Sequence, residues 1–235
     1  MGVKKIFLKN KIFYWFYKIQ KIYKNKNPNF HFGEFGEDIF INRIFKNFKK
    51  GFYIDIGAYH PIKGSLTYLL YKKGWSGLNI DLSKVSIDLF NIARPHDINI
   101  NCAITTKNEE TFFFENSEIN QQNSLIKQNN KQIKKKIIGR NLNSLLDEFK
   151  INDFQFLNID TEGTELDILT TINFEKYRPI LLATENNSFD DGDQKREKII
   201  NFMKEKKYNL VNIIGVTMFF IDNKFKNEVK DLIKI

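Results

Sequence analysis

The sequence predicts an α/β fold: a mainly parallel sheet with an antiparallel edge and helices on both faces. Two observations lead to this prediction. From about residue 36 onward, short apolar runs alternate with helical patterns, which is typical of a parallel sheet covered on both sides. The last two apolar runs, 210–214 and 217–221, are joined through a tight turn at Gly215, which indicates an antiparallel edge.

Charge divides the chain into two parts. The 235 residues have a formal net charge of +9, but residues 1–30 contain eight Lys and no acidic residue, so the rest of the chain carries only +1. We therefore predict a basic aromatic N-terminal arm at 1–30 and a single domain at 31–235. The Asn-Pro-Asn triplet at 27–29 is expected to end any helix and to mark the boundary.

Composition excludes several classes of protein. With 42% hydrophobic and 28% charged residues the chain can build a core, so it is not a disordered protein. Twelve Gly and one Cys exclude a collagen-like or disulfide-stapled chain. No apolar run approaches the roughly 18 residues that a membrane span needs. The lone Cys102 cannot form an internal disulfide and favours a reducing compartment, so a cytoplasmic location is expected.

The first half of the domain alternates helices and strands. A helix at 37–48 has apolar residues on one face, and the strand at 51–55 is an apolar run that ends in an acid. The helix at 65–73 stops at Gly74 and is followed by a second acid-ended strand at 78–81. The helix at 83–93 stops at Pro95, and a third strand covers 98–104.

The second half continues the alternation after an irregular segment. A short extra strand is expected at 111–115, and the Asn-, Gln- and Lys-rich segment 116–136 is expected to form a loop over the sheet edge or its mouth. A helix at 142–149 precedes the fourth strand at 154–160, which ends in an acid, and a helix at 165–171 follows. The fifth strand at 180–184 and a helix with a charged face at 195–206 lead to the closing pair.

Acidic residues follow four of the predicted strands: Asp55, Asp81, Asp160 and Glu185. In open α/β sheets ligands bind beyond the carboxyl ends of the strands, so these carboxylates are expected to face a crevice. The pattern predicts a binding site for a small molecule, and three neighbouring acids favour a cationic one.

The first turn narrows the choice of ligand. Gly57 allows a close backbone approach, and Asp81, 26 residues after Asp55, is placed to accept hydrogen bonds from ribose hydroxyls. The Gly-rich fingerprint for a pyrophosphate is missing, because Tyr59, His60 and Pro61 occupy the turn. A nicotinamide dehydrogenase is therefore disfavoured. S-adenosylmethionine, with one ribose, no phosphate and a positive sulfur, fits better.

Five stretches carry a resemblance to a known family. The chain resembles the FkbM family of S-adenosylmethionine-dependent methyltransferases over roughly residues 33–222, in stretches that occur in the family's order: FGEDIF (35–40), FYIDIGAYHPIKGSLTYLLYKKGWSGLNIDLS (52–83), NCAITTKNEETFFF (101–114), FLNIDTEGTELDIL (156–169) and RPILLATEN (178–186). The resemblance implies a Rossmann-like methyltransferase fold with a mainly parallel seven-stranded sheet. It also implies methyl transfer, usually to oxygen on sugars or natural products, as in polysaccharide biosynthesis.

The resemblance also implies cofactor contacts. Asp55 and Gly57 would line the methionine and ribose portion of the cofactor, Asp81 would hold the ribose diol, and Ser65 and Thr67 would open the following helix near the amino-acid carboxylate. The other residues implied to contact the cofactor are Ala58, Tyr59, Leu82, Asn101, Cys102, Ala103 and Asp160, with the three from Asn101 to Ala103 flanking the adenine. The family often has Ala-Asn in the first turn, whereas the turn here is bulkier, as in the subgroup with His-Pro.

Methyl transfer to a hydroxyl needs a general base, because a sugar hydroxyl is a poor nucleophile. The candidate catalytic residues are His60, Asp160 and Glu162. His60 titrates in a suitable range but is also a plausible capping residue, Asp160 could instead cap the next helix, and Glu162 could bond the turn backbone.

Two further acidic features have open interpretations. Glu185 is expected either to bind the acceptor or to pair with a neighbouring Arg. The acidic loop of Asp190, Asp191 and Asp193 matches no calcium loop and is predicted to be a solvated turn, so no metal site is predicted.

Two roles remain open for the arm. Its mixture of Lys and aromatic residues suits peripheral contact of residues 1–30 with the inner membrane surface, but also a helix packed on the domain with its lysines in water. Nucleic acid is not expected as a partner, because the body has no further basic stripe.

The sequence predicts an O-methyltransferase for a small-molecule or glycan acceptor, and the oligomeric state stays open. The alternatives are a methyltransferase for a nitrogen or phosphate-linked acceptor, and a membrane-associated interaction protein with a vestigial cofactor fold.

Overall fold

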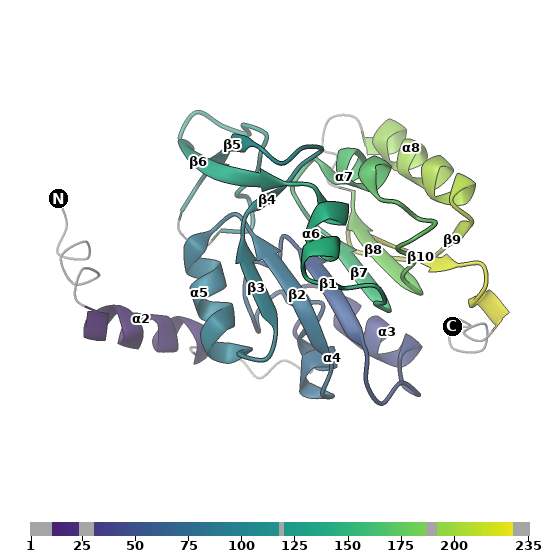
Figure 1. Cartoon of the computed structure of the whole chain (residues 1–235), viewed down its shortest axis with the longest axis horizontal. Coiled ribbons are helices and arrows are strands. Elements are labelled where there is room, and N and C mark those ends of the chain that lie inside the picture. The colour runs from purple at the N-terminus through teal and green to yellow at the C-terminus, as the bar shows by residue number, and fades with distance from the viewer. Residues whose placement is uncertain (1–10, 24–30, 118–119, 187–191, 228–235) are drawn as a thin grey trace.

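The computed structural model describes residues 11–23, 31–117, 120–186 and 192–227. At its centre lies a seven-stranded sheet in the order β3-β2-β1-β7-β8-β10-β9 (Figure 1). Its strands are β1 (Phe52–Ile56), β2 (Ser76–Asp81), β3 (Ile98–Asn101), β7 (Phe156–Ile159), β8 (Leu181–Glu185), β9 (Tyr208–Ile214) and β10 (Thr217–Asp222). Within this sheet β10 is antiparallel to β8 and β9, and the remaining pairs are parallel. The Rossmann-like sheet with an antiparallel edge is therefore confirmed.

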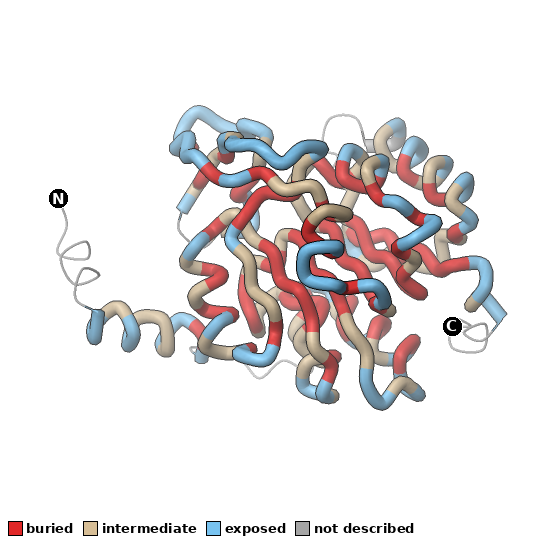
Figure 2. The backbone as a smooth tube through the Cα atoms, in the orientation of Figure 1, coloured by how far each residue is buried: buried red, intermediate tan, exposed pale blue. Residues whose placement is uncertain are grey.

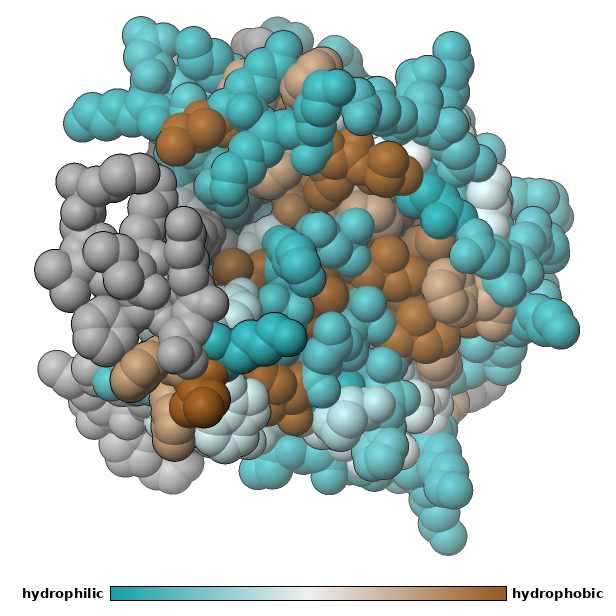
Figure 3. All heavy atoms as spheres, turned by 60° about the vertical axis from the view of Figure 1, so that its left-hand side comes forward, coloured by the Kyte–Doolittle hydropathy of each residue, from teal (hydrophilic) through white to brown (hydrophobic). Residues whose placement is uncertain are grey.

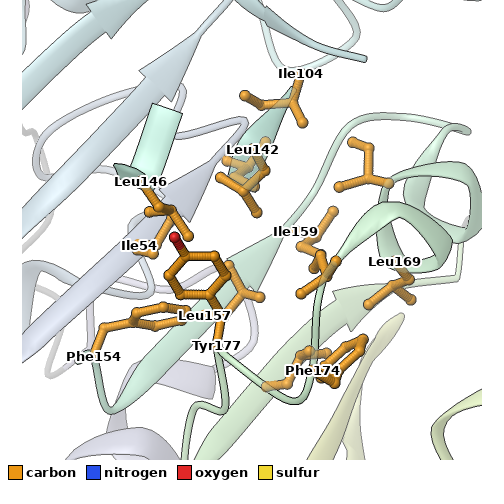
Figure 4. Packing of buried hydrophobic residues seen from close by; sticks show 14 of the residues in the cluster. Ile54, Ile104, Leu142, Leu146, Phe154, Leu157, Ile159, Leu169, Phe174 and Tyr177 are labelled. Carbon is orange, nitrogen blue, oxygen red and sulfur yellow. The ribbon is translucent and has the colours of Figure 1, made fainter. Parts of the chain in front are cut away.

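Helices pack on both faces because side chains alternate between the faces along each strand. The helices of the domain are α3 (Glu37–Ile44), α4 (Tyr68–Lys72), α5 (Lys84–Ala93), α6 (Leu142–Glu148), α7 (Glu165–Thr171) and α8 (Gly192–Glu205). Ile54 and Ile56 of β1 join the core that includes α6, α7 and α8 (Figure 4). Tyr53 points to the other face, where the core includes α3, α4 and Trp75. Figure 2 shows the buried strands between helices with exposed outer sides.

A second, smaller sheet corrects two predictions. The strand expected at 98–104 leaves the large sheet after Asn101 and continues as β4 (Ala103–Ile104) beside β6 (Ile133–Arg140) and β5 (Glu110–Glu115). The loop predicted at 116–136 thus ends in a strand. The strand was not predicted because it is largely exposed and contains three consecutive lysines, Lys134 to Lys136, in place of an apolar pattern. It forms through its pairing with β5. Lys135 and Lys136 form ion pairs with Glu115 and Glu110 of β5.

Two helices are shorter than predicted. The helix expected at 37–48 ends at Ile44, and Phe45 and Phe48 then turn inward to contact Trp75. The helix expected at 65–73 begins only at Tyr68, because the preceding residues form a hydrogen-bonded loop at the ends of the strands.

Part of the predicted arm is a helix, α2 (Lys11–Tyr23), that packs beside α5 (Figure 1). The Tyr14 hydroxyl donates a hydrogen bond to Asp88 of α5 at 3.0 Å, and Ile22 is buried. The expected boundary at 27–29 lies outside the described residues. Among the helices that the structure describes, none combines the length and the apolar character needed to cross a bilayer.

Candidate active site

A cavity lies at the carboxyl ends of β1, β2 and β7, where the strand-end acids were expected to meet. It encloses about 760 Å³ of free space, including its open mouth. Nine of the residues predicted to contact a ligand line it: Asp55, Gly57, Ala58, Tyr59, Ser65, Asp81, Leu82, Cys102 and Asp160. The acids at the ends of three different strands therefore share one cavity, as the topology predicted.

Gly57 brings the three strand ends together. Its φ is +81°, a left-handed conformation that favours glycine. Its N–H donates to the carbonyl of Ile80 at 2.9 Å, and a Cβ at this position would lie 1.6 Å from the carbonyl oxygen of Asp160. No side chain fits there, so glycine is required for the close approach of β1 to β7.

Asp55 is a buried carboxylate held from two sides. It accepts hydrogen bonds from the Thr67 hydroxyl at 2.7 Å and from the Asn158 amide at 2.9 Å. Burial raises the pKa of the Asp55 carboxyl, and these two hydrogen bonds oppose the rise. Thr67 itself does not line the cavity, so its place in the structure is to orient Asp55.

Asp81 is fixed by main-chain donors. Its carboxylate oxygens accept from the N–H groups of Tyr59 at 2.8 Å and Ser83 at 2.7 Å. Burial raises the pKa of Asp81 to about 6, although these bonds act in the opposite direction. A carboxylate offers about four acceptor positions, so Asp81 keeps capacity to accept from a hydroxyl group in the cavity.

The wall next to Asp81 is apolar. Leu82, Cys102, Ile104 and Leu125 line it, and burial raises the pKa of the Cys102 thiol to about 12, so this sulfur is neutral and not a nucleophile. The neighbours of Cys102 do not line the cavity. The side-chain amide of Asn101 donates hydrogen bonds to the carbonyls of Asp81 and Leu82. Ala103 is buried in a small apolar cluster of the second sheet.

Three carboxylates gather where β7 and β8 end. Asp160, Glu162 and Glu185 each place an oxygen within 4.8 Å of the others. The pKa of Asp160 lies well above its usual range, mainly because of burial, and repulsion from Glu185 adds to the rise. Burial also raises the pKa of Glu185, which shares a hydrogen bond with Asp160. Two carboxyl groups this close hold a proton between them more tightly than either would alone.

A comparison with protein families identifies the chain. Residues 55–210 match the family described as the methyltransferase FkbM domain. The chain belongs to the FkbM methyltransferase family. It is therefore an S-adenosylmethionine-dependent methyltransferase, as the resemblance implied.

Solved structures add only distant likenesses to this FkbM methyltransferase. A TehB-like SAM-dependent methyltransferase from Corynebacterium glutamicum is 12% identical, with a TM-score of 0.45 over 90% of this chain and 97% of that one. A candidate RNA methyltransferase from Pyrococcus horikoshii is 10% identical, with a TM-score of 0.44 over 91% of this chain and 98% of that one. No curated protein matches the chain. At these scores neither structure bears on the assignment.

The FkbM methyltransferase cavity fits the cofactor that its family implies. The buried acids Asp55 and Asp81 suit a ligand that has hydroxyl donors and a positive charge. The apolar wall at Leu82 and Cys102 suits a flat aromatic base. Gly57 also lines the cavity and presents main-chain atoms there without a side chain. Charge, polarity and shape thus agree with S-adenosylmethionine.

His60, one of the three candidate bases, does not line the cavity. Its Nδ1 accepts from the N–H groups of Ile62 and Lys63, both at 3.0 Å, so its Nε2 carries the proton and donates to the carbonyl of Lys21 at 3.1 Å. Burial lowers the pKa of His60 to about 4. Both nitrogens are occupied, and the residue shapes the turn after β1.

Glu162, a further candidate base, lies close to Asp160. It belongs to the acidic cluster, but it is a turn residue with φ +57° and does not line the cavity. Its carbonyl accepts a hydrogen bond from the Ser124 hydroxyl at 2.9 Å. The side chains of the acidic loop of Asp190, Asp191 and Asp193 lie outside the described part of the chain, and the absence of a metal site stays a prediction.

Sequence reasoning missed the amide-rich wall of the cavity. Asn120, Gln121 and Asn123, from the predicted loop, form this wall together with Leu125. Ser124 holds the segment in place through hydrogen bonds to the carbonyls that follow β7. The loop was expected near the mouth of the sheet, but amide composition alone did not show which residues face inward.

Arg94 is a second residue that sequence reasoning did not single out. It is fully buried and donates to the Tyr53 hydroxyl at 3.1 Å, to Thr67 Oγ1 at 2.8 Å and to Ser65 Oγ at 2.7 Å. A further bond at 3.0 Å reaches the carbonyl of Pro61. Arg94 therefore ties the end of α5 to the loop that supports Asp55.

Proposed function

We propose that this FkbM methyltransferase transfers a methyl group to a hydroxyl of a sugar or glycan precursor. The observation that carries the proposal is the pair of Asp160 and Glu185, two carboxyl groups with raised pKa values beside a cavity of strand-end acids. A carboxylate with a raised pKa is a stronger base than an ordinary one, which is what an unreactive hydroxyl requires.

Each part of the cavity is assigned a part of the cofactor. Asp81 would hold the ribose hydroxyls through its remaining acceptor capacity, and Leu82 and Cys102 would contact the adenine. Asp55 and Ser65 lie beside the methionine portion, where the carboxylate of Asp55 suits an ammonium group. All five of these residues line the cavity.

The residues of the acid pair are assigned the proton transfer. When bound, the cofactor would supply a methyl group on a positive sulfur, and transfer of this group to the acceptor oxygen would break the carbon–sulfur bond. The ionised member of the Asp160–Glu185 pair accepts the hydroxyl proton as the new bond forms. The pair then releases this proton to solvent through the mouth. Most of the remaining catalysis comes from alignment of the hydroxyl and exclusion of water.

A neighbouring groove supports a polar acceptor. It shares Tyr59, Gly64 and Gln121 with the cofactor cavity and is also lined by Glu34 and Lys63. Carboxylate, ammonium and amide groups can bond the many hydroxyls of a carbohydrate, and the ring of Tyr59 offers a flat apolar surface.

Calorimetry tests the cofactor assignment. We expect S-adenosylmethionine to bind the wild-type chain and to bind Asp81→Ala roughly tenfold or more weakly, because charged hydrogen bonds are lost. Asp153→Ala is the matched control, since Asp153 is exposed and does not line the cavity. Equal, tight binding by Asp81→Ala would remove the ribose assignment, and no binding by the wild type would remove the cofactor.

A transfer assay tests the acceptor and the base. Radiolabelled S-adenosylmethionine is incubated with the wild-type chain and a panel of nucleotide sugars and oligosaccharides, and the product is analysed by mass spectrometry. We expect a methyl ether that Glu185→Gln and Asp160→Asn do not form, while both retain cofactor binding. A methylated nitrogen, or full activity in both variants, would contradict the proposal.

A further inference from the structure

Helix α2 exposes apolar side chains to solvent. Ile12, Phe13, Trp15, Phe16 and Tyr23 are between 49% and 65% exposed. At 100° per residue, positions 12, 16 and 23 lie along one strip of the helix, with 13 and 15 on its two sides. Figure 3, which brings this side of the molecule forward, shows hydrophobic side chains at its surface.

The opposite side of α2 is attached to the domain. Tyr14, on that side, donates to Asp88 at 3.0 Å, and Ile22, in the last turn beside the Trp15 edge of the strip, is buried at 1% exposure. The carbonyl of Lys21 accepts a hydrogen bond from His60. These contacts fix the rotation of the helix, so the apolar strip is held outward. A surface helix ordinarily buries its apolar face, and α2 does the reverse.

The sequence of the arm carries charge of one sign. Residues 1–30 contain eight Lys and no Asp or Glu. Lys18 and Lys21 lie over the rings of Tyr14 and Tyr17, at 4.6 Å and 5.5 Å from the ring centres. An apolar strip with basic margins and aromatic rings is complementary to an anionic lipid surface, where rings settle at headgroup depth and lysines meet lipid phosphates.

We propose that α2 is a membrane-surface helix that docks this protein, apolar strip inward, on a bilayer containing anionic lipids. A second copy of the chain is a poorer occupant. Two copies of the same helix would bring lysines against lysines with no acid in either arm to neutralise them. The exposed apolar sector, from Phe13 to Trp15 around the helix, is also wider than a two-position coiled-coil seam.

Tryptophan fluorescence offers a direct readout with the full chain. The protein has two Trp residues, of which Trp15 is 50% exposed on α2 and Trp75 is 2% exposed in the core. We expect vesicles of phosphatidylcholine with phosphatidylserine to shift the emission to the blue, and Trp15→Phe to abolish the shift while sedimentation with the vesicles persists. An unchanged spectrum together with no sedimentation would overturn the proposal.

Paired variants assign the binding to this face. Phe13→Gln with Phe16→Gln should weaken vesicle partitioning about tenfold or more, since both rings lose their apolar burial. The matched control, Phe112→Gln with Phe149→Gln, changes two exposed Phe of the body and should bind as the wild type does. Equal loss in both pairs would overturn the assignment.

The lipid charge and the oligomeric state complete the test. Each Lys at an anionic surface contributes roughly fivefold to partitioning, so pure phosphatidylcholine vesicles should bind far less protein, and added salt should release it. Equal binding to both vesicle types would contradict the charge argument. Analytical ultracentrifugation that shows a dimer, lost in the Phe13 and Phe16 variant without any vesicle binding, would instead assign the face to a second copy.

Discussion

Replacing Gly57 with Ala tests how closely β1 approaches β7 at the cofactor cavity. Gly57 and Gly74 share a left-handed backbone, with φ +81° and +91°. An alanine at either position therefore carries a similar conformational cost of about 1–2 kcal/mol. A Cβ at Gly74 would meet nothing within 4 Å, so Gly74→Ala should cost only this amount.

The two glycines differ in the space around them. A Cβ at Gly57 would lie 1.6 Å from the Asp160 carbonyl oxygen and 2.7 Å from its carbon, whereas ordinary contact begins at 3.4 Å. The carbonyl must retreat, although the Asp160 N–H is bonded to the Ile56 carbonyl at 2.9 Å. We expect an additional loss of about 3–5 kcal/mol, which is large against a typical total stability of about 5–15 kcal/mol.

Urea unfolding of the two variants and the wild type measures the difference between the glycines. Calorimetric titration with S-adenosylmethionine then reports on the cavity, and we expect Gly74→Ala to bind as the wild type does while Gly57→Ala does not bind. If the free energies of unfolding of the two variants agree within about 0.5 kcal/mol and both variants bind the cofactor equally, then β1 and β7 do not approach each other as closely as described.

Three further predictions concern charged groups. Cofactor affinity should rise with pH through about 6, where Asp81 ionises and becomes a full acceptor, and calorimetry of Asp81→Asn should show a flat profile. Glu185→Gln should raise the free energy of unfolding by about 1 kcal/mol near pH 8 and by less near pH 5. The reason is that a carboxyl with a raised pKa contributes stability at low pH, and this stability is lost as the pH rises. A larger gain near pH 5 than near pH 8 would contradict the pairing of Glu185 with Asp160. Arg94→Met should lower the free energy of unfolding in urea by about 3–5 kcal/mol, because the hydrogen bonds from Arg94 to Ser65 and Thr67, in the loop that supports Asp55, are lost. Arg43 is exposed, so Arg43→Met should change this free energy little. Equal effects of the two substitutions would contradict the role of these hydrogen bonds.

The large sheet could be predicted because its strands and the helices between them each leave a local pattern in the sequence. Apolar runs mark the strands, and the helices between them force parallel pairing, so the carboxyl ends of β1, β2 and β7 meet at one edge. The strand β6 escaped prediction because its Lys-rich run depends on pairing with β5 rather than on an apolar face. Strand formation there is a tertiary effect that no local pattern records.

The site was predictable to the extent that strand direction fixes side-chain position. Asp55, Asp81 and Asp160 line the cavity because each lies at a strand end or directly after one. In loops no period fixes where a side chain points, so Thr67 turned out to support Asp55, and His60 turned out to anchor α2 to the turn.

His60 shows why a residue type alone does not single out one of the candidate bases. An imidazole suits proton transfer in isolation, but burial and three hydrogen bonds hold this ring neutral and fully engaged. The pairing of Asp160 with Glu185 depends instead on β7 and β8 lying side by side, which brings together two acids that are 25 positions apart in the chain. Burial raises the pKa of both carboxyls, and repulsion from Glu185 adds to the rise at Asp160, so the pair has the raised proton affinity that the proposed base requires. Asp160 was one of three candidates that the sequence offered, and its partner Glu185 becomes apparent only when the strands are paired.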